Sequence, residues 1–316
     1  MITKTIVNEN PVIYSSFPTM TTYKDCLVIF FRQGLVDKSN PHGFHGKVKC
    51  VKIKLTDLKK LFDQNCSLNI QEEIVFESQN ELDAIVSKLS DDLYTLATRI
   101  FVKNKINDVF LSVSDDCNFK ERIKINIKDV NLAAMYGKAI SFGSYYIFSA
   151  YGSLKNENFT RPLFIATSDF YHFELFSYLE SSKDLMLNET SVVKINSSYI
   201  AFSRKDTYPD YAIYLSSSKN LSNWDTPKKL IDFALAPMAI IVNGEIFVSF
   251  RDNQNNINKI SIINTKTLEK KVVDTYKGSL FDGGYSDLAF IDGTIYMVYY
   301  TNNIAPFIKM AKLKPF

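Results

Sequence analysis

The sequence predicts an all-β fold, a six-bladed β-propeller, from its composition, its hairpin signals and a repeated strand unit. Its 316 residues include 18 Tyr and 24 Phe, and aromatic and β-branched residues favour strands. The dipeptides Asn243–Gly244 and Asp292–Gly293 are strong signals of two-residue hairpin turns. The repeated unit is a polar turn followed by an apolar strand, and its copies recur at intervals of roughly 40 to 80 residues, near the period of propeller blades.

Six copies of this unit are recognisable along the chain. In sequence order they are Lys24–Arg32, Lys103–Ser114, Phe142–Tyr151, Asn196–Arg204, Asn243–Arg251 and Ile291–Tyr300. A propeller usually closes its ring by combining the first and last strands of the chain in one blade. Ile2–Val7 and Phe307–Leu313 are the candidates for that closure.

A second strand often follows the unit and ends in a Ser/Asp turn and an aromatic residue. Phe110–Phe119, Phe164–Phe173 and Ile213–Trp224 have this form. The polar side chains of such a turn can bond its own backbone, and the aromatic ring can plug the hairpin. We interpret these turns as structural staples.

Residues 1–316 are expected to form a single propeller domain, because no linker rich in Pro, Gly or Ser divides the chain. The stretch 55–90 departs from the repeat. Its segments Leu58–Asp63 and Glu81–Leu89 look like short helical turns, and we interpret the stretch as an insertion within the domain.

Charge and apolar content argue against several classes of protein. The net charge of +3 comes without a Lys/Arg block, which argues against a nucleic-acid groove. No apolar run reaches the roughly 18 residues that span a bilayer. The start of the chain has no signal-peptide core, so we expect a cytoplasmic protein or a trimmed secreted or surface protein.

The cysteines show no pattern of metal ligands. Cys26, Cys50, Cys66 and Cys117 form no CxxC pair, and buried free thiols are the simplest interpretation. We therefore expect no metal and no cofactor. The sequence leaves the oligomeric state open.

Arg32, Arg204 and Arg251 each end a copy of the repeated unit. Equivalent positions in a radial fold face a common centre, so the three guanidiniums would approach one cavity at the mouth of the ring. A guanidinium is a fixed fork that suits a carboxylate or phosphate. The pattern suggests a carboxylate clamp, and the alternative is that each arginine forms a local salt bridge within its own blade.

The stretch Gly283–Tyr300 carries the most specific motif. Two glycines precede Tyr285, a Ser-Asp-Leu run follows it, and an Asp-Gly hairpin comes next. This order resembles the last-blade motif of the sialidase (neuraminidase) superfamily of Asp-box glycoside hydrolases. The resemblance implies that Tyr285 is the nucleophile.

The stretch Asn188–Arg204 is similar to a second sialidase motif, in which a glutamate opens a strand and an arginine ends the next strand. The match implies that Glu189 is the base that activates the tyrosine and that Arg204 is a member of the carboxylate clamp. Arg251 falls where the next clamp arginine of the family lies. The staple turns also look like degenerate Asp-boxes.

The first repeated unit resembles the family as well. Arg32 is closely followed by Asp37, which the resemblance implies is the acid/base residue, whereas a solvated loop carboxylate is the alternative. His42 and His45 lie in the same loop and would contact the substrate or stabilise the loop. Ser16 stands where the family usually carries the arginine of an Arg-Ile-Pro run, so either Arg32 replaces that arginine or the substrate anion is held differently.

Together these motifs imply a retaining exo-glycosidase that removes a terminal acidic sugar from a glycan or glycoconjugate, and sialidases do so with a tyrosine nucleophile. The departure at Ser16 favours a relative of sialic acid, another nonulosonic or Kdo-type sugar. Two other hypotheses stay open. One is a non-catalytic glycan-binding propeller, such as an adhesin or phage module. The other is a five-bladed glycosidase or phosphorylase that uses paired carboxylates, and the number of blades separates it from the first hypothesis.

Overall fold

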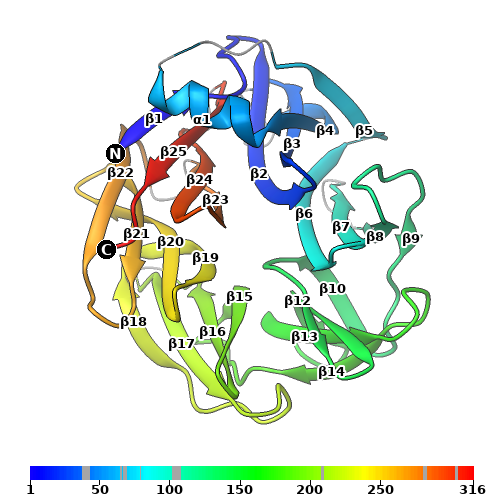
Figure 1. Cartoon of the computed structure of the whole chain (residues 1–316). Coiled ribbons are helices and arrows are strands. Elements are labelled where there is room, and N and C mark those ends of the chain that lie inside the picture. Colours follow the sequence, from blue (N-terminus) through cyan, green and yellow to red (C-terminus); the bar gives the residue numbers. More distant parts are fainter. Residues whose placement is uncertain are drawn as a thin grey trace.

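Six antiparallel sheets stand around a central axis as the blades of a propeller, in the part of the chain that the structure describes (Figure 1). This computed structural model describes residues 1–316 except 38–42, 65, 67–69, 79, 102–107, 208–209, 280–282 and 303–304. The predicted fold class, an all-β six-bladed propeller, is confirmed. The hypothesis of a five-bladed enzyme is therefore wrong.

Within each blade, the strands are given in order from the innermost, next to the axis, to the outermost. Blade 1 contains β2 (Ile13–Tyr23), β3 (Cys26–Leu35), β4 (Phe44–Lys54) and β5 (Glu72–Glu77). Blade 2 contains β6 (Glu81–Ser90), β7 (Leu93–Ile100), β8 (Asp108–Ser114) and β9 (Ile123–Lys124). Blade 3 contains β10 (Val130–Met135) and β11 (Ile140–Phe142), which both pair with β12 (Tyr145–Leu154), then β13 (Arg161–Thr167) and β14 (Glu174–Tyr178).

The second half of the ring repeats this arrangement. Blade 4 contains β15 (Leu187–Ile195), β16 (Ser198–Lys205), β17 (Ala212–Ser218) and β18 (Lys228–Asp232). Blade 5 contains β19 (Ala234–Val242), β20 (Glu245–Gln254), β21 (Ile257–Asn264) and β22 (Lys270–Lys277). Blade 6 contains β23 (Ser286–Ile291), β24 (Thr294–Tyr300), β25 (Ile308–Leu313) and β1 (Ile2–Thr5).

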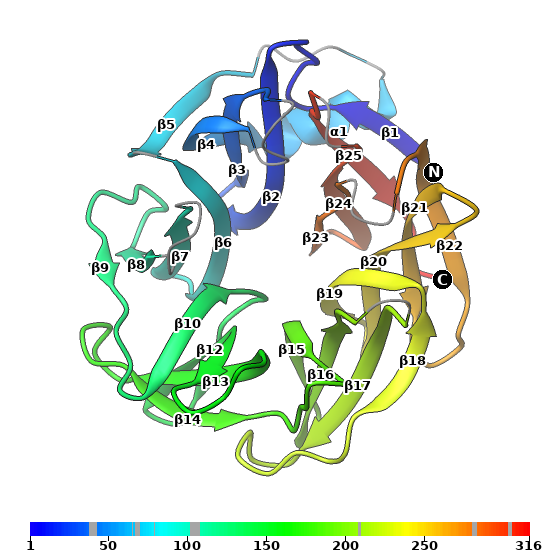
Figure 2. The ribbon, with the colours of Figure 1, turned by 180° about the vertical axis from the view of Figure 1, so that it is seen from behind.

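Blade 6 closes the ring by combining strands from the two ends of the sequence. β1 pairs antiparallel with β25, with Ile2 opposite Lys312 and Thr5 opposite Lys309. Figure 2 shows the same closure from behind, with β1 and β25 side by side. This pairing is the closure that the sequence predicts, and it leaves β1 as the outermost strand of the blade.

The stretch 55–90 is only partly what the sequence predicts. Its first part contains the helix α1 (Leu55–Asp63), which lies between β4 and β5 of blade 1. The helical interpretation of Glu81–Leu89 is wrong, because this segment is β6, the innermost strand of blade 2. Leu82, Ala84 and Val86 are buried at alternate positions, which is the period of a strand rather than of a helix.

Five of the six repeated units coincide with the second strands of their blades, namely β3, β12, β16, β20 and β24. The unit at Lys103–Ser114 does not, because it contains β8, the third strand of blade 2. The second strand of that blade is β7, which follows the polar turn Asp91–Asp92 and ends near Arg99. This strand has the same design as the repeated unit: a polar turn, an apolar run and an arginine near its end. Arg99 therefore occupies the same strand-end position as Arg204 and Arg251.

Apolar side chains fill the spaces between neighbouring blades. Between blades 4 and 5, for example, Phe202 and Ile213 pack with Val248 and Phe250, all fully buried. Fully burying one such side chain contributes about 1.5 to 3 kcal/mol. Each blade is therefore covered on both faces by its neighbours, and the inner strands of all six blades face the centre of the ring.

The staple turns bond their own backbone, as in the hairpin after β17. Ser218 Oγ accepts from the Asn220 backbone N–H at 3.2 Å, and the Asn220 side chain accepts from two further turn amides. Trp224 donates to the Leu221 carbonyl at 2.9 Å and stacks on Phe164 of blade 3 with ring centroids 4.8 Å apart. The turn therefore joins two blades, which fits a structural role.

Candidate active site

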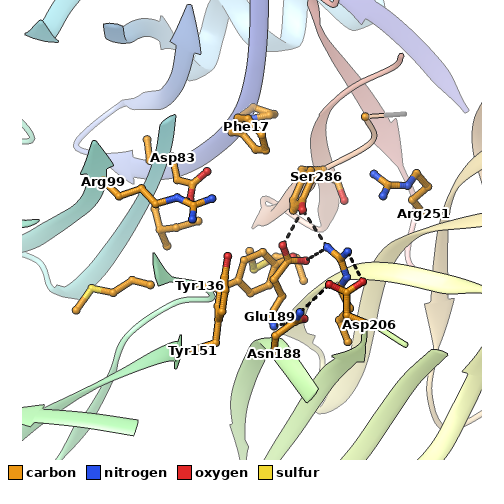
Figure 3. A pocket seen from close by; sticks show the side chains of 18 of the residues that line it. Phe17, Asp83, Arg99, Tyr136, Tyr151, Asn188, Glu189, Asp206, Arg251 and Ser286 are labelled. Carbon is orange, nitrogen blue, oxygen red and sulfur yellow. Dashed lines mark hydrogen bonds and ion pairs between the residues drawn. The ribbon is translucent and has the colours of Figure 1, made fainter. Parts of the chain in front are cut away.

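A cavity of about 520 Å³ opens at the centre of the ring and is lined by side chains of all six blades (Figure 3). This volume lies in the usual range for small-molecule sites. Charged, aromatic and methionine side chains share the wall. The polar and aromatic lining residues are Phe17, Asp83, Arg99, Tyr136, Tyr151, Thr160, Asn188, Glu189, Arg204, Asp206, Arg251, Tyr285, Ser286 and Tyr300.

Tyr285 and Glu189, from blades 6 and 4, are hydrogen-bonded at one side of the cavity. Tyr285 Oη donates to Glu189 Oε1 at 2.6 Å. Arg204 Nη1 lies 3.0 Å from Glu189 Oε2 and 3.2 Å from Tyr285 Oη. Glu189 sits in a β-bulge near the start of β15, where the register shifts between Leu187 and Thr190. A bulge re-aims a side chain, and here it accompanies a carboxylate in direct contact with the phenol.

The environment of Tyr285 keeps its phenol neutral. Burial raises the pKa of Tyr285 well above its ordinary value, and the adjacent Glu189 carboxylate raises this pKa further. Arg204 and Arg251 act in the opposite direction without cancelling the increase. The phenol therefore gives up its proton only to a base in contact with it, and Glu189 is in that position.

Arg204 is held by two carboxylates. Its Nη1 contacts Glu189, and its Nη2 donates to Asp206 Oδ1 at 2.9 Å. Asn188 fixes Asp206 in turn, because its side-chain amide donates to Asp206 Oδ2 at 3.1 Å. Figure 3 shows this chain of contacts along one wall of the cavity. The charge of Arg204 is thus largely balanced within the protein.

Arg251 differs from Arg204 because no carboxylate of the described residues forms an ion pair with it. It is 2% exposed, and within the described residues its Nε and Nη1 have no hydrogen-bond partner. Its guanidinium lies 5.7 Å from the centre of the Tyr285 ring. Gly284 makes room for it, because a Cβ at this positive-φ position would meet Arg251 Cδ at 2.7 Å. A buried guanidinium with N–H groups that no described residue binds is a strong attractor for an anion.

Asp83 and Arg99 form an ion pair on the opposite wall, across the cavity from Glu189 and Arg251 (Figure 3). The sequence interpretation missed both residues. Asp83 lies on β6, the strand interpreted as helical, and Arg99 lies near the end of β7. The signal for Arg99 is the strand-end position that it shares with Arg204 and Arg251.

Arg32 is not among the residues that line the cavity. Its Nε donates to the Glu81 carbonyl at 2.7 Å and its Nη2 to Asn80 Oδ1 at 3.0 Å. The guanidinium fills a slot beside two glycines, since a Cβ at Gly46 would meet Arg32 Nε at 2.6 Å and one at Gly34 its Nη2 at 3.1 Å. Burial lowers the pKa of Arg32 to about 10. The structure thus brings two of the three predicted arginines to the cavity, and Arg32 joins blades 1 and 2.

The remaining predicted residues that the structure describes all belong to blade 1. Asp37 is half-buried just after β3 and is not among the lining residues. His45 lies on β4 with an exposed side chain, and His42 lies outside the described residues. Ser16 is fully buried, and its neighbour Phe17 lines the cavity where the resemblance expected an arginine side chain nearby.

The described residues contain no metal-like cluster and no long apolar helix. No three His, Cys, Asp or Glu side chains gather in them as they would around a metal ion. None of their helical segments has the length and hydropathy of a membrane-spanning helix.

Comparisons of sequence gave no relative. No family model matches the chain, and no curated protein matches it either.

Comparison of structures gave many matches at low identity. A protein of unknown function from Dyadobacter fermentans has a TM-score of 0.78 at 14% identity, with 99% of each chain covered. Trypanosoma rangeli sialidase in complex with sialic acid has a TM-score of 0.65 at 11% identity and is covered over 56% of its chain. The same sialidase with 2,3-difluorosialic acid, described as a covalent intermediate, has a TM-score of 0.67 at 10% identity and is covered over 58%.

These likenesses concern the fold. This chain is covered over 97% and 98% in the two sialidase comparisons, but it spans little more than half of the sialidase chains. The chain is therefore a six-bladed propeller of the kind found in these sialidases.

Proposed function

We propose that this protein is a retaining exo-glycosidase that removes a terminal acidic sugar, with Tyr285 as the nucleophile. The observation that carries the proposal is the 2.6 Å hydrogen bond from the Tyr285 phenol to Glu189 inside a cavity that also holds Arg251. A tyrosine is a poor nucleophile at its ordinary pKa near 10, and a carboxylate in contact with it can take its proton as attack proceeds.

The substrate class follows from the charges in the cavity. A keto-acid sugar carries a carboxylate beside its anomeric carbon, and this carboxylate would repel an anionic nucleophile. A neutral phenol avoids the repulsion, and the pKa of Tyr285 is raised, which keeps it neutral. Arg251 would bind the sugar carboxylate, since its Nε and Nη1 have no partner among the described residues. Arg204 would serve mainly to hold the Glu189 side chain close to the phenol.

The reaction would proceed in two steps. In the first, Tyr285 Oη bonds to the anomeric carbon, its proton passes to Glu189, and the leaving oxygen departs with a proton from an acid. In the second, water attacks the glycosyl-tyrosine, the acid residue accepts the water proton, and Glu189 returns its proton to the phenol. Two displacements at one carbon give retention of configuration.

We assign the acid/base role to Asp83, although the sequence resemblance implies Asp37. Asp83 lines the cavity on the wall opposite Tyr285, where a departing oxygen would lie, and Arg99 orients its carboxylate. Asp37 is not among the lining residues. The two assignments are separable, because each residue can be replaced alone.

The second candidate is a non-catalytic propeller that binds an acidic glycan. Two observations favour it: Ser16 stands in place of a clamp arginine, and Arg204 is already paired with two carboxylates. The Tyr285–Glu189 contact favours catalysis, because binding alone needs no such pair.

The test is a screen with fluorogenic glycosides of sialic acid and of its eight-carbon relatives. We expect hydrolysis of at least one glycoside, retention of configuration in the first-formed sugar by NMR, and loss of activity by orders of magnitude in Tyr285→Phe. Tyr300→Phe is the matched control, because Tyr300 stacks on Tyr285 with ring centroids 6.3 Å apart. A 2,3-difluoro analogue of the accepted sugar should label Tyr285, detectable by peptide mass spectrometry. Binding of the sugars without hydrolysis or labelling would instead support the non-catalytic candidate.

A further inference from the structure

A buried ionic cluster joins four blades next to the aromatic wall of the cavity. Lys138, in the connection between β10 and β11, points its ammonium at oxygens of three other blades. It donates to Thr19 Oγ1 and to the Met20 carbonyl at 3.0 Å and to the Val86 carbonyl at 2.9 Å, and it forms an ion pair with Asp287. We call these five residues the Lys138 hub.

Asp287 completes the hub from the side of blade 6. Its side chain is fully buried, and its Oδ2 accepts from Thr19 Oγ1 at 2.9 Å and from the Met20 amide at 2.7 Å. Its Oδ1 accepts from the Leu288 amide at 2.8 Å. The Thr19 hydroxyl also accepts from the Val86 amide at 3.2 Å. Polar networks in which every member is bonded are rigid and fix one arrangement of their elements.

The hub is connected to the cavity wall through the chain. Phe17, Tyr136 and Tyr285 each stand two positions before a side chain of the hub. The Phe17 and Tyr136 rings contact the Tyr285 ring, with centroids 5.0 Å and 6.4 Å away. Gly137, beside Tyr136, packs against β15, because a Cβ there would meet the Thr190 carbonyl at 2.7 Å. Thr190 is the neighbour of Glu189, so the hub is braced against both partners of the phenol–carboxylate contact.

We propose that the Lys138 hub is a positioning device that holds the Tyr285 phenol in register with Glu189. Lys138 and Asp287 are positioning residues, since neither lines the cavity. The ring is closed separately by β1 and β25, so loss of the hub should leave the propeller assembled. The kinetic part of this inference rests on the proposed function, and the spectroscopic part does not.

The first test compares two lysine substitutions of similar setting. Lys138→Met removes the ammonium from the hub. The Lys138 side chain is 24% exposed. Lys309→Met is the control: Lys309 pairs with Asp274 at 2.8 Å, is 22% exposed and also lies in an ion pair between strands. We expect Lys138→Met to lower kcat about 10- to 100-fold with KM changed less than about threefold, as misplacement of a reacting group does. A rise in KM with kcat unchanged, or an equal fall in kcat in both variants, would overturn the proposal.

The second test is chemical rescue. Lys138→Ala leaves four oxygen acceptors around an empty site, and ammonium chloride should restore kcat about tenfold by supplying the missing donors. Tetramethylammonium chloride at the same ionic strength has no N–H group and should restore nothing. Equal effects of both salts would contradict the assignment of the ammonium as the positioning group.

The third test needs no catalysis. The ¹³Cζ signal of labelled Tyr285, assigned by its loss in Tyr285→Phe, reports the hydrogen bond of the phenol. We expect this signal to shift in Lys138→Met and to stay in place in Lys309→Met. A shift would support the hub even if the wild-type protein hydrolysed none of the glycosides, and an unchanged signal in a folded variant would overturn it.

Discussion

Replacement of Arg251 by methionine should stabilise the free protein and weaken its affinity for acidic sugars. Two N–H groups of this 2%-exposed guanidinium have no partner among the described residues. Each buried unsatisfied donor costs about 1 to 3 kcal/mol. The cation–π contact with Tyr285, at 5.7 Å, offsets part of this cost by about 0.5 to 2 kcal/mol. With central values, the two donors cost about 4 kcal/mol and the ring contact offsets about 1 kcal/mol. We therefore expect Arg251→Met to raise the free energy of unfolding by about 3 kcal/mol.

The size of the expected change in Tm follows from the length of the chain. An unfolding entropy of about 2.1 cal/mol/K per residue gives about 0.7 kcal/mol/K for 316 residues. The Tm should rise by about 4.5 °C in calorimetry. Loss of one or two charge-assisted hydrogen bonds should weaken binding of an acidic monosaccharide about 10²- to 10³-fold in isothermal titration.

Arg204→Met is the control for this prediction. It removes the cation between Glu189 and Asp206, and leaving the buried Glu189 carboxylate without its ion-pair partner should lower the Tm. If Arg251→Met lowers the Tm as much as Arg204→Met does, Arg251 has a partner in the free protein and the reasoning is wrong.

Three further predictions concern the proton donor, the stability of the protein at alkaline pH, and Gly137. Asp83→Asn should slow hydrolysis of glycosides with poor leaving groups by about 10²-fold or more, and should slow hydrolysis of aryl glycosides far less. Asp37→Asn is the comparison. If Asp37→Asn shows the larger loss with poor leaving groups, the acid role returns to Asp37. Burial raises the pKa of Tyr151 from 10.0 to about 12, so the stability it contributes is present below pH 10 and is lost as pH rises toward 12. At pH 11 this loss is about 1.4 kcal/mol, and chemical denaturation should show a shallower alkaline decline in Tyr151→Phe. Gly137→Ala should lower the free energy of unfolding by about 2 kcal/mol or more, because of its positive φ and its contact with β15. At Gly143 a Cβ would meet nothing within 4 Å, so Gly143→Ala should lower it by about 1 kcal/mol. Equal losses of stability in thermal unfolding would contradict the steric argument.

The fold could be predicted because it depends on a pattern repeated along the chain. Five of the six units mark second strands, since these strands are paired on both sides and keep long apolar runs. Blade 2 was the exception. Its inner strand carries Leu82, Ile85, Val86 and Leu89 at positions that also fit a helical period. Asp83 of this strand lines the cavity, which the local sequence does not reveal.

The candidate site could be predicted only in part. Tyr285, Glu189 and Arg204 lie in local motifs, and they meet in the structure. Arg32 and Arg99 occupy similar strand-end positions, yet one fills a slot between blades and the other reaches the cavity. That difference depends on the neighbouring blade, which local sequence does not encode.

The closure of blade 6 has a consequence for biosynthesis. The ribosome makes β1 before the other strands of the ring, yet β1 finds its partner only when β25 has emerged. A nascent chain released before blade 6 would carry Glu189 and Arg204 without a phenol beside them. The contact between Tyr285 and Glu189 thus forms only when the ring is complete. Under the proposed function, a translation product without blade 6 would be unable to cleave glycans.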